Sequence, residues 1–578
     1  MSAAGSSWNC KNRRNIMNEI TGGQLAAEAL VARKVEKIFT LSGGHITPIY
    51  QHLENTSVEL FDTRHEQAAV FMAEATARMT RKAATVMVTA GPGFTNALTG
   101  IASASLSNAP IVLIAGCVGL ETREKLDLQD MRQAPVIEPM VKKALVCHKT
   151  ERIPEYIDMA YRIAESGRPG PVYLELPVDV LNAKIDAEKA VRPMTVMESR
   201  PVDLAGAKKI IDLLAKSERP MIIGGSGVWY SRSETVLKDF IEKTGAPLYT
   251  FAMGRGVVPD THKLCFESSL AIRPGSAMHA SLNADLVIIL GTRLSLFNIF
   301  GGIYNRNARM VQVDILPEEI GRNRSIDVPI VSDIRSLLEE CLRLAGKKKT
   351  SMAERFKPWV KELTAKDAEG KKLAMLNWKS DTVPIHPLRL AWEINSFMNG
   401  QDDIVIADGG DTATWCGMTR TMRKGGHYLD YGLYGSLAVG LPYANAAKLL
   451  YPEKRVLLMS GDGAIGFNFM EFETSVRKGL PVVAVISNDQ GWGMIRHSQE
   501  IRMGHAIPNG TFIGKVNYHG MVEALGGLGL YVEKPADIRP ALEKAFASGK
   551  TACINVMTDT TTVSPGSIAL ANLGGYKA

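Results

Sequence analysis

Apolar residues along the chain fall into short runs that alternate with stretches of helical spacing. Between residues 19 and 190 the runs are rich in β-branched residues, which favours strands. These predicted strands lie at 37–41, 85–89, 111–115 and 172–175. The stretches at 23–33 and 66–78 carry apolar residues at helical spacing, which indicates amphipathic helices. Alternation of this kind is typical of a parallel sheet flanked by helices.

The same alternation returns in two further blocks. In residues 200–345 an amphipathic stretch at 204–216 precedes the predicted strands, which lie at 221–223, 286–290 and 310–313. In residues 385–560 the predicted strands lie at 404–407, 455–459, 482–487 and 553–556. The charged segment 346–384 between these blocks predicts a linker that contains one helix.

We therefore expect an α/β protein with three domains of parallel sheet flanked by helices, the first and third alike in layout. A length of 578 residues agrees with three domains of ordinary size. Residues 1–18 are polar and predict a disordered leader. Residues 561–578 are rich in Ser, Gly and Ala and predict a C-terminal tail, for which a frayed end is the simplest expectation.

Composition and charge exclude several classes of protein. Hydrophobic residues make up 46% and charged residues 22% of the chain, which is typical of a soluble protein with a full core. The net charge of +7 is spread along the chain, so we expect no nucleic-acid partner. No apolar run is long enough for a membrane span, and no secretory signal is present. Seven scattered cysteines indicate neither a zinc site nor a disulfide framework, so we expect a cytoplasmic protein.

Two strands of the third block end in oxygen-bearing residues. One runs into Gly461-Asp462-Gly463, and the next ends at Asn488-Asp489-Gln490-Gly491. Neighbouring parallel strands would bring both ends to the carboxyl edge of the sheet, where α/β proteins bind ligands. Main-chain N–H groups near Gly463 and Ala464 are placed to face an anion at a helix start. Oxygen ligands that leave positions open for phosphate suit Mg²⁺. A lone Gly-Asp-Gly, however, is more often an ordinary turn.

The spacing between these two motifs is more specific. The 24 residues between Gly463 and Asn488 resemble the thiamine-diphosphate motif. The resemblance implies that Mg²⁺ is held by Asp462, Asp489 and the main-chain carbonyl of Gly491, and that Gly461, Gly463 and Ala464 contact the cofactor. Asp489 stands where the family has Asn. It keeps an oxygen ligand but adds a negative charge, which should tighten Mg²⁺ binding and repel diphosphate.

Further cofactor contacts follow from the same resemblance. Glu66, in Asp62-Thr-Arg-His-Glu66, matches the family's catalytic carboxylate. Such a carboxyl group, screened from water, shares the proton of the cofactor's aminopyrimidine ring; without the resemblance it would be an ordinary acidic helix start. Leu437 is implied as the wedge under the bent cofactor, and the Gly435 carbonyl as acceptor from its 4′-amino group. Plain core packing is the alternative for Leu437.

The family architecture also implies an assembly. Residues 19–190 correspond to a pyrimidine-binding domain, 200–345 to a middle domain and 385–560 to a diphosphate-binding domain. In similar enzymes the cofactor lies between the pyrimidine-binding domain of one subunit and the diphosphate-binding domain of another. The resemblance therefore implies a homo-oligomer, with a dimer as the minimum and a tetramer expected.

The substrate side resembles benzaldehyde lyase and 2-hydroxyacyl-CoA lyase most closely, and acetolactate synthase more distantly. The matching stretches include Ser42-Gly-Gly-His-Ile46 and Thr89-Ala-Gly-Pro-Gly-Phe-Thr-Asn96. His45 corresponds to a histidine that moves substrate protons, and Gln129 to a glutamine that bonds the substrate oxygen. Outside this context a lone histidine is more often structural, and a loop glutamine more often a surface residue.

Departures from the benzaldehyde lyase pattern reshape the pocket. Ala413 stands in place of an aromatic residue, and Met494, after Trp492 and Gly493, in place of a small alanine. Trp492 and Met494 are still expected to line the cofactor site. A Gly-Met pair at this point is also similar to acetolactate synthase.

The sequence thus predicts a thiamine-diphosphate and Mg²⁺-dependent lyase or carboligase acting on a small carbonyl compound, a 2-hydroxy ketone or a 2-hydroxyacyl-CoA. A decarboxylating synthase of the acetolactate type and a non-catalytic, cofactor-holding scaffold are the alternatives. The scaffold is disfavoured by the presence of Glu66. Gly224-Gly-Ser-Gly227 is only a fragment of a nucleotide fingerprint, which leaves ADP or no nucleotide in the middle domain; no flavin pattern is present, so FAD is not expected.

Overall fold

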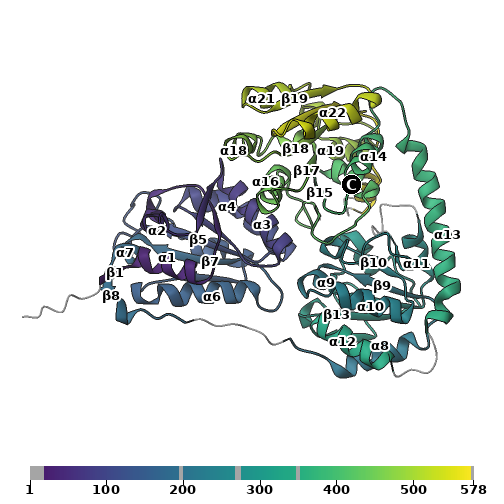
Figure 1. Cartoon of the computed structure of the whole chain (residues 1–578), viewed down its shortest axis with the longest axis horizontal. Coiled ribbons are helices and arrows are strands. Elements are labelled where there is room, and N and C mark those ends of the chain that lie inside the picture. Colours follow the sequence, from purple (N-terminus) through teal and green to yellow (C-terminus); the bar gives the residue numbers. More distant parts are fainter. Residues whose placement is uncertain (1–18, 194–199, 267–274, 347–351, 574–578) are drawn as a thin grey trace, which may run out of the picture.

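The computed structural model describes residues 19–193, 200–266, 275–346 and 352–573. Three parallel sheets of six strands each, covered by helices, form three units (Figure 1). This confirms the predicted fold class. The predicted leader, residues 1–18, lies outside the described residues, as do residues 574–578 of the tail. Among the described helices, none combines the length and apolar character required to cross a bilayer.

The first sheet has the strand order β3-β2-β4-β5-β7-β6. Its strands are β2 (Lys37–Thr40), β3 (Glu59–Asp62), β4 (Ala84–Val88), β5 (Ile111–Cys117), β6 (Lys143–Val146) and β7 (Val172–Pro177). The helices around it are α1 (Gly22–Ala32), α2 (Thr47–Leu53), α3 (Glu66–Thr80), α4 (Pro92–Ser107), α5 (Gln133–Ile137), α6 (Ile153–Glu165) and α7 (Val178–Asn182). A two-stranded antiparallel ribbon, β1 (Glu19–Thr21) with β8 (Lys184–Asp186), ties the start of this unit to its end.

The third sheet has the order β16-β15-β17-β18-β20-β19. Its strands are β15 (Ile404–Asp408), β16 (Tyr428–Leu429), β17 (Val456–Gly461), β18 (Val483–Asn488), β19 (Leu528–Val532) and β20 (Ala552–Met557). Numbered in chain order, the first and third sheets both read 2-1-3-4-6-5. The expected likeness of these two blocks is therefore confirmed at the level of topology.

The third unit carries most of the candidate site, and its sheet is flanked by helices. They are α14 (Pro387–Phe397), α15 (Gly410–Thr419), α16 (Gly440–Leu450), α17 (Asp462–Ile465), α18 (Glu471–Arg477), α19 (Gly493–Met503), α20 (Pro508–Thr511), α21 (Tyr518–Ala524), α22 (Pro535–Ala547) and α23 (Pro565–Leu573). Helix α23 shows that much of the tail is helical, where the sequence favoured a frayed end. Its start is held by Ser567, whose hydroxyl bonds the Asp411 carboxylate at 2.5 Å, a long-range contact that no local pattern reveals.

The middle sheet differs from the other two. Its strands are β9 (Pro220–Gly224), β10 (Leu248–Thr250), β11 (Cys265–Phe266), β12 (Leu286–Leu290), β13 (Arg309–Asp314) and β14 (Val328–Val331). Their order, β11-β10-β9-β12-β13-β14, reads 3-2-1-4-5-6 in chain order, the doubly wound arrangement of many nucleotide-binding sheets. Its helices are α8 (Leu204–Leu214), α9 (Ser226–Tyr230), α10 (Glu234–Thr244), α11 (Ser276–Asn283) and α12 (Ile334–Ala345).

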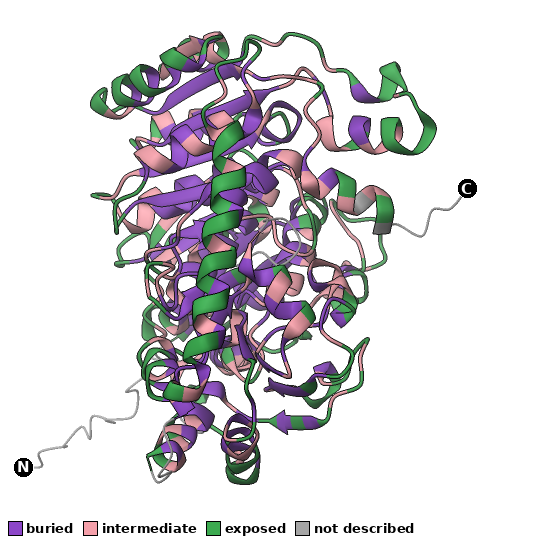
Figure 2. Cartoon of the chain, turned by 90° about the vertical axis from the view of Figure 1, so that its right-hand side faces the viewer, coloured by how far each residue is buried: buried purple, intermediate pink, exposed green. Residues whose placement is uncertain are grey.

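The predicted linker contains one long helix, α13 (Met352–Trp378). It runs along the surface from the middle unit to the third, and much of its outer face is exposed (Figure 2). Two residues of its inner face, Trp359 and Leu363, are buried. The Trp359 ring N–H donates to the Pro220 carbonyl at 3.0 Å. The helix is therefore anchored on the middle sheet through a narrow apolar stripe.

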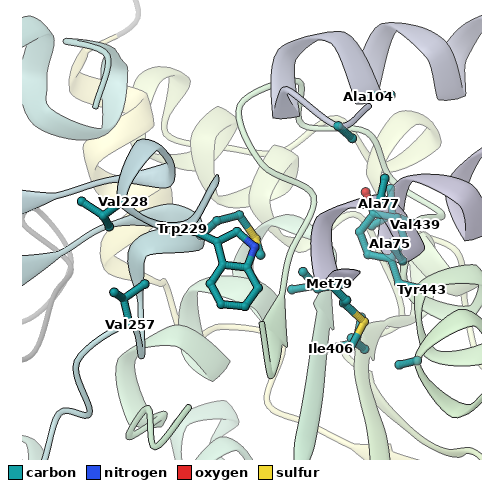
Figure 3. Packing of buried hydrophobic residues seen from close by; sticks show 14 of the residues in the cluster. Ala75, Ala77, Met79, Ala104, Val228, Trp229, Val257, Ile406, Val439 and Tyr443 are labelled. Atoms are coloured by element: carbon teal, nitrogen blue, oxygen red, sulfur yellow. The ribbon is translucent and has the colours of Figure 1, made fainter. Parts of the chain in front are cut away.

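The three units meet around Trp229 of α9 (Figure 3). Its ring N–H donates to the Arg78 carbonyl at the end of α3, at 2.7 Å, and the Arg81 guanidinium lies 3.9 Å from the ring centroid. On the other side, a Cβ on Gly425 would come within 2.7 Å of the ring, so only glycine lets the third unit approach this closely. One side chain of the middle unit thus packs against both other units.

We predict that Trp229→Ala lowers the free energy of unfolding by about 3–5 kcal/mol, because a buried ring and its hydrogen bond are both lost. Urea unfolding followed by circular dichroism measures the change. Leu373→Ala, at a position on α13 that is 59% exposed, is the control and should shift the free energy by less than about 0.5 kcal/mol. Equal shifts in the two variants would contradict the role assigned to the junction.

Candidate active site

Asp462 and Asp489 lie at the carboxyl edge of the third sheet. Strands β17 and β18 are adjacent and parallel, with Gly461 opposite Ser487, so the residues that follow each strand come together. Asp462 begins α17 and is 2% exposed. Its carboxylate accepts the Gly491 N–H at 3.0 Å, and its carbonyl accepts the Tyr518 hydroxyl at 3.0 Å. The motifs at 461–463 and 488–491 therefore lie next to each other, as expected for the ends of adjacent parallel strands.

The electrostatics of this edge are suited to a cation. Burial raises the pKa of Asp462, and the charge of Asp489 raises it further. Burial also raises the pKa of Asp489, although the Arg496 guanidinium opposes the shift. Two carboxyl groups in one poorly solvated site repel each other when both are ionised. A divalent cation would remove that repulsion, so the residues fit the predicted Mg²⁺ site.

The donor set is small. Among the described residues, no three His, Cys, Asp or Glu side chains gather as metal ligands. The predicted set instead combines two carboxylates with the Gly491 carbonyl, which leaves positions open for phosphate and water oxygens. Mg²⁺ is commonly bound in this way.

Glycines let two larger side chains close over this edge. A Cβ on Gly463 would lie 2.7 Å from the Trp492 ring, and one on Gly410 would lie 2.4 Å from the Met494 sulfur. Trp492 and Met494 therefore pack directly on main chain, and both line the same cavity. Gly461 ends β17, and Ala464 is buried within α17.

The loop before α16 presents Gly435 and Leu437 to the cavity. Gly435 has φ +70°, and the space beside its Cα is open. Leu437 is only half-buried, so it is not a core residue. The buried Asp408 carboxylate steadies this loop by accepting the N–H groups of Gly409 and Gly440 at 2.8 and 2.9 Å. Burial raises the pKa of Asp408 to about 6.

Glu66 belongs to a second group of residues, at the carboxyl edge of the first sheet. It is the first residue of α3 and is 5% exposed. The Asn96 side-chain amide donates to its carboxylate at 2.9 Å. A Cβ on Gly93 would lie 3.5 Å from the same carboxylate and 2.8 Å from Thr89. These neighbours leave one face of Glu66 next to glycine main chain.

His45 and Gln129 lie beside this carboxylate group. The His45 Nδ1 atom is 3.1 Å from the Thr89 hydroxyl. Burial holds the pKa of His45 below its ordinary value of 6.5, although Asp127 opposes the shift, so the imidazole is neutral at neutral pH. Gln129 adopts a left-handed backbone (φ +68°) and packs against Gly91, where a Cβ would come within 2.8 Å.

A buried ion pair fixes the loop that carries Gln129. Arg123 reaches across to Glu175 at 2.5 Å, and the Glu175 carboxylate is 4% exposed. Gln133 then joins the loop to the sheet, since it accepts the Gly91 N–H at 2.9 Å and donates to the Tyr173 hydroxyl at 2.9 Å. The loop is therefore positioned by contacts with β5 and β7 and with the turn after β4.

One cavity of about 1440 Å³ is lined by residues of all three units. Its lining includes Asp462 and Asp489 of the third unit, Arg168 of the first unit, and Arg293 and Asp314 of the middle unit. His45, Glu66 and Gln129 are not among the described residues that line it. Each chain therefore carries two separate groups of candidate residues, one on each of the two similar sheets.

The glycine-rich turn at 224–227 in the middle unit packs tightly against the end of β12. The Gly225 N–H donates to the Leu290 carbonyl at 2.9 Å, and the Gly227 N–H to the Gly291 carbonyl at 3.0 Å. A Cβ on Gly225 would overlap the Thr292 hydroxyl. Close contact between β9 and β12 accounts for these glycines without a nucleotide, although Gly227 also lines the cavity.

Three further site residues were missed from the sequence: Asp411, Arg496 and His497. Arg496 donates to the Asp489 carboxylate at 2.9 Å. The two ring nitrogens of His497 lie 3.0 Å from the Asp411 carboxylate and 3.1 Å from the Thr560 carbonyl. Burial opposes the charge on this ring, but these acceptors outweigh it and raise the pKa of His497. Asp411 follows a glycine pair at the end of β15, a pattern similar to Gly461-Asp462, and that signal could have found it.

Comparison with known proteins agrees with this arrangement. Three segments match the domains of thiamine pyrophosphate (thiamine diphosphate) enzymes: the N-terminal TPP binding domain over residues 20–136, the central domain over 207–341 and the C-terminal TPP binding domain over 408–556. Each of the three sheets falls largely within one of these segments.

Several curated proteins are similar over nearly the whole chain. A probable acetolactate synthase of Mycobacterium bovis is 32% identical over 544 residues, which cover 94% of this chain and 96% of that protein. An oxalyl-CoA decarboxylase of Escherichia coli is 30% identical, with coverage of 93% and 95%. A 2-hydroxyacyl-CoA lyase of Oryza sativa is 28% identical, with coverage of 94% and 96%. The chain therefore belongs to the thiamine pyrophosphate enzyme family.

Proposed function

We propose that this protein is a thiamine-diphosphate and Mg²⁺-dependent C–C lyase or carboligase. Its substrates would be 2-hydroxy ketones or 2-hydroxyacyl-CoA thioesters, from which an aldehyde is released or to which one is added. The observation that carries this proposal is His45, a neutral imidazole beside Thr89 at the edge that holds Glu66. A neutral imidazole can take the proton of a substrate hydroxyl group, a step that decarboxylation of a 2-oxo acid does not require.

The residues present would hold the cofactor from both ends. Asp462, Asp489 and the Gly491 carbonyl would bind Mg²⁺, and Leu437 would support the bent cofactor. Glu66, held by Asn96 at 2.9 Å, would keep a proton on the aminopyrimidine ring. When bound, the cofactor supplies a nucleophilic carbon that adds to a carbonyl group and accepts the electron pair of the breaking bond.

His45 and Gln129 would then act on the hydroxyl proton and the oxygen of the substrate. His45 would remove the hydroxyl proton as the C–C bond breaks and return it during ligation. Gln129, fixed against Gly91, would donate its amide N–H to the substrate oxygen as negative charge develops there.

A complete site would require two chains. Within one chain, Glu66 does not line the cavity that Asp462 and Asp489 line. A symmetric dimer would bring the Glu66 edge of each protomer against the Asp462 edge of its partner, and so form two equivalent sites. A tetramer would repeat that arrangement.

Two arginines in the lining of the cavity favour a substrate or ligand that carries phosphate. Arg168 and Arg293 both line it. Arg168 pairs with Glu319, whereas among the described residues no carboxylate forms an ion pair with Arg293. Arginine binds phosphate oxygens well because its donors form a planar fork. The phosphates of CoA or ADP would suit these arginines, which line the same cavity as Asp462.

A decarboxylating synthase of the acetolactate type remains the second candidate. Met494 packs on Gly410 within the cavity, and a Gly-Met pair at this point is similar to acetolactate synthase. The probable acetolactate synthase named above has 32% identity to this chain.

A substrate panel separates the two candidates. The protein with thiamine diphosphate and Mg²⁺ is incubated separately with pyruvate, benzoin and a 2-hydroxyacyl-CoA, and aldehydes and CO₂ are measured. We expect aldehyde from at least one hydroxy substrate. Rapid CO₂ release from pyruvate, with no aldehyde from either hydroxy substrate, would contradict the lyase proposal and favour the synthase.

The pH dependence of cleavage tests His45. Because the imidazole must be neutral to accept a proton, kcat/KM should fall as the pH drops through the pKa of His45, which burial holds below 6.5. His45→Ala should reduce kcat/KM by about a hundredfold and remove this acidic limb. His148→Ala, outside the proposed site, is the matched control. If the acidic limb of the kcat/KM profile were unchanged in His45→Ala, the titrating group would be another residue and the role proposed for His45 would be wrong.

Subunit complementation tests the shared site. Glu66→Gln and Asp462→Asn should each abolish most of the turnover when expressed alone. Co-expressed, they form heterodimers in which one site carries both substitutions and the other carries neither, so about a quarter of the activity should return. No recovery, with heterodimers demonstrated by differential tags, would contradict a site built from two chains.

A further inference from the structure

Asp489 is the residue of the metal motif that departs from the family pattern, and the structure gives it a dedicated partner. Arg496 lies on α19, seven residues further along the chain. Its guanidinium donates to the Asp489 carboxylate at 2.9 Å, and the two side chains are 2% and 19% exposed. An ion pair this well buried is screened little by solvent, unlike a surface pair.

Arg496 is held in place from other directions as well. It donates to the Thr560 carbonyl, and the Phe512 ring lies beneath its guanidinium at 5.6 Å. A Cβ on Gly491 would come within 3.3 Å of it. The guanidinium therefore occupies one fixed position, between the proposed metal ligands and the C-terminal segment.

The charge balance of this edge explains why such a partner is needed. An asparagine would supply an oxygen ligand without charge, whereas Asp489 adds a negative charge next to Asp462 and Asp411. The nearby His497 ring already lies between Asp411 and the Thr560 carbonyl. Asp489 would otherwise be an uncompensated buried charge in a site that must also accept diphosphate.

We propose that Arg496 is the counter-charge of Asp489, and that the two side chains act as one neutral unit in place of the usual asparagine. This inference rests on the proposed metal site and assigns Arg496 a positioning role within it. The pair would supply a carboxylate oxygen to the cation while leaving the charge seen by the diphosphate unchanged. It follows that Asp489 and Arg496 can be replaced together but not singly.

The test measures metal binding rather than turnover. Mn²⁺ serves as the probe, because free Mn²⁺ is quantified directly by electron paramagnetic resonance, and titrations are run with thiamine diphosphate present. Four proteins are compared: the unsubstituted chain, D489N, D489N/R496Q, and the control D489N/R502Q. Arg502 is an exposed residue of the same helix, so its removal changes the helix charge equally without touching Asp489.

We expect D489N to weaken Mn²⁺ binding by at least about tenfold, because Arg496 is then an unpaired buried cation beside the metal. D489N/R496Q should recover binding to within about threefold of the unsubstituted protein, while D489N/R502Q should stay as weak as D489N. Thermal unfolding without metal or cofactor adds an independent readout, in which D489N/R496Q should be at least as stable as D489N.

Two outcomes would overturn the inference. They differ in whether the proposed metal site is contradicted as well. If D489N/R496Q binds Mn²⁺ no better than D489N, Arg496 is not the counter-charge, although the metal assignment stands. If the unsubstituted protein binds no Mn²⁺ in the presence of the cofactor, the metal assignment of the proposed function fails together with the inference.

Discussion

Helix α3 packs against α16, and one arginine at the end of α3 links the first unit to the other two. Arg78 in the last turn of α3 donates to the Asp430 carbonyl at 2.9 Å and to the Tyr443 hydroxyl at 3.3 Å, and it reaches the Met253 sulfur of the middle unit. Its charge is offset by the fully buried Glu74 one turn earlier, at 3.6 Å. Since Glu66 is the first residue of the same helix, the contacts that fix its last turn also fix the position of the proposed catalytic carboxylate.

Charged side chains are also buried at the carboxyl ends of β17 and β18, but there they do not balance one another. At the junction, Arg78 and Glu74 balance each other within the protein. At the ends of β17 and β18, Asp462 and Asp489 are both acidic, and Arg496 balances only one of them. A buried charge without a partner is strongly unfavourable. The first arrangement pairs opposite charges within the chain, whereas the second favours binding of a cation.

Two similar sheets in one chain account for the division of the site. Each carries its polar residues at its carboxyl edge: Glu66, His45 and Gln129 on the first, Asp462 and Asp489 on the third. The intramolecular junction brings α3 and α16 together, and the Asp62 carboxylate also pairs with Arg477 of α18 at 2.9 Å. The described cavity nevertheless includes only the second group. The topology thus supplies both halves in every protomer, and completion of a site is left to association.

The fold class, the likeness of the first and third sheets, and the convergence of Asp462 with Asp489 could all be predicted from the amino-acid sequence. These features depend on local periodicity and on strand ends, which are written in consecutive residues. The functional reading of Glu66, Leu437 and His45 came from resemblance to a family. Three further features became visible in the folded chain alone: Arg496 pairs with Asp489, Asp411 holds His497 and the start of α23, and Trp229 joins three units. Asp489 and Arg496 lie in a loop and in the helix after it, and the other partners lie on elements far apart in the chain. Side-chain pairing is chosen by packing and burial, which no local pattern encodes.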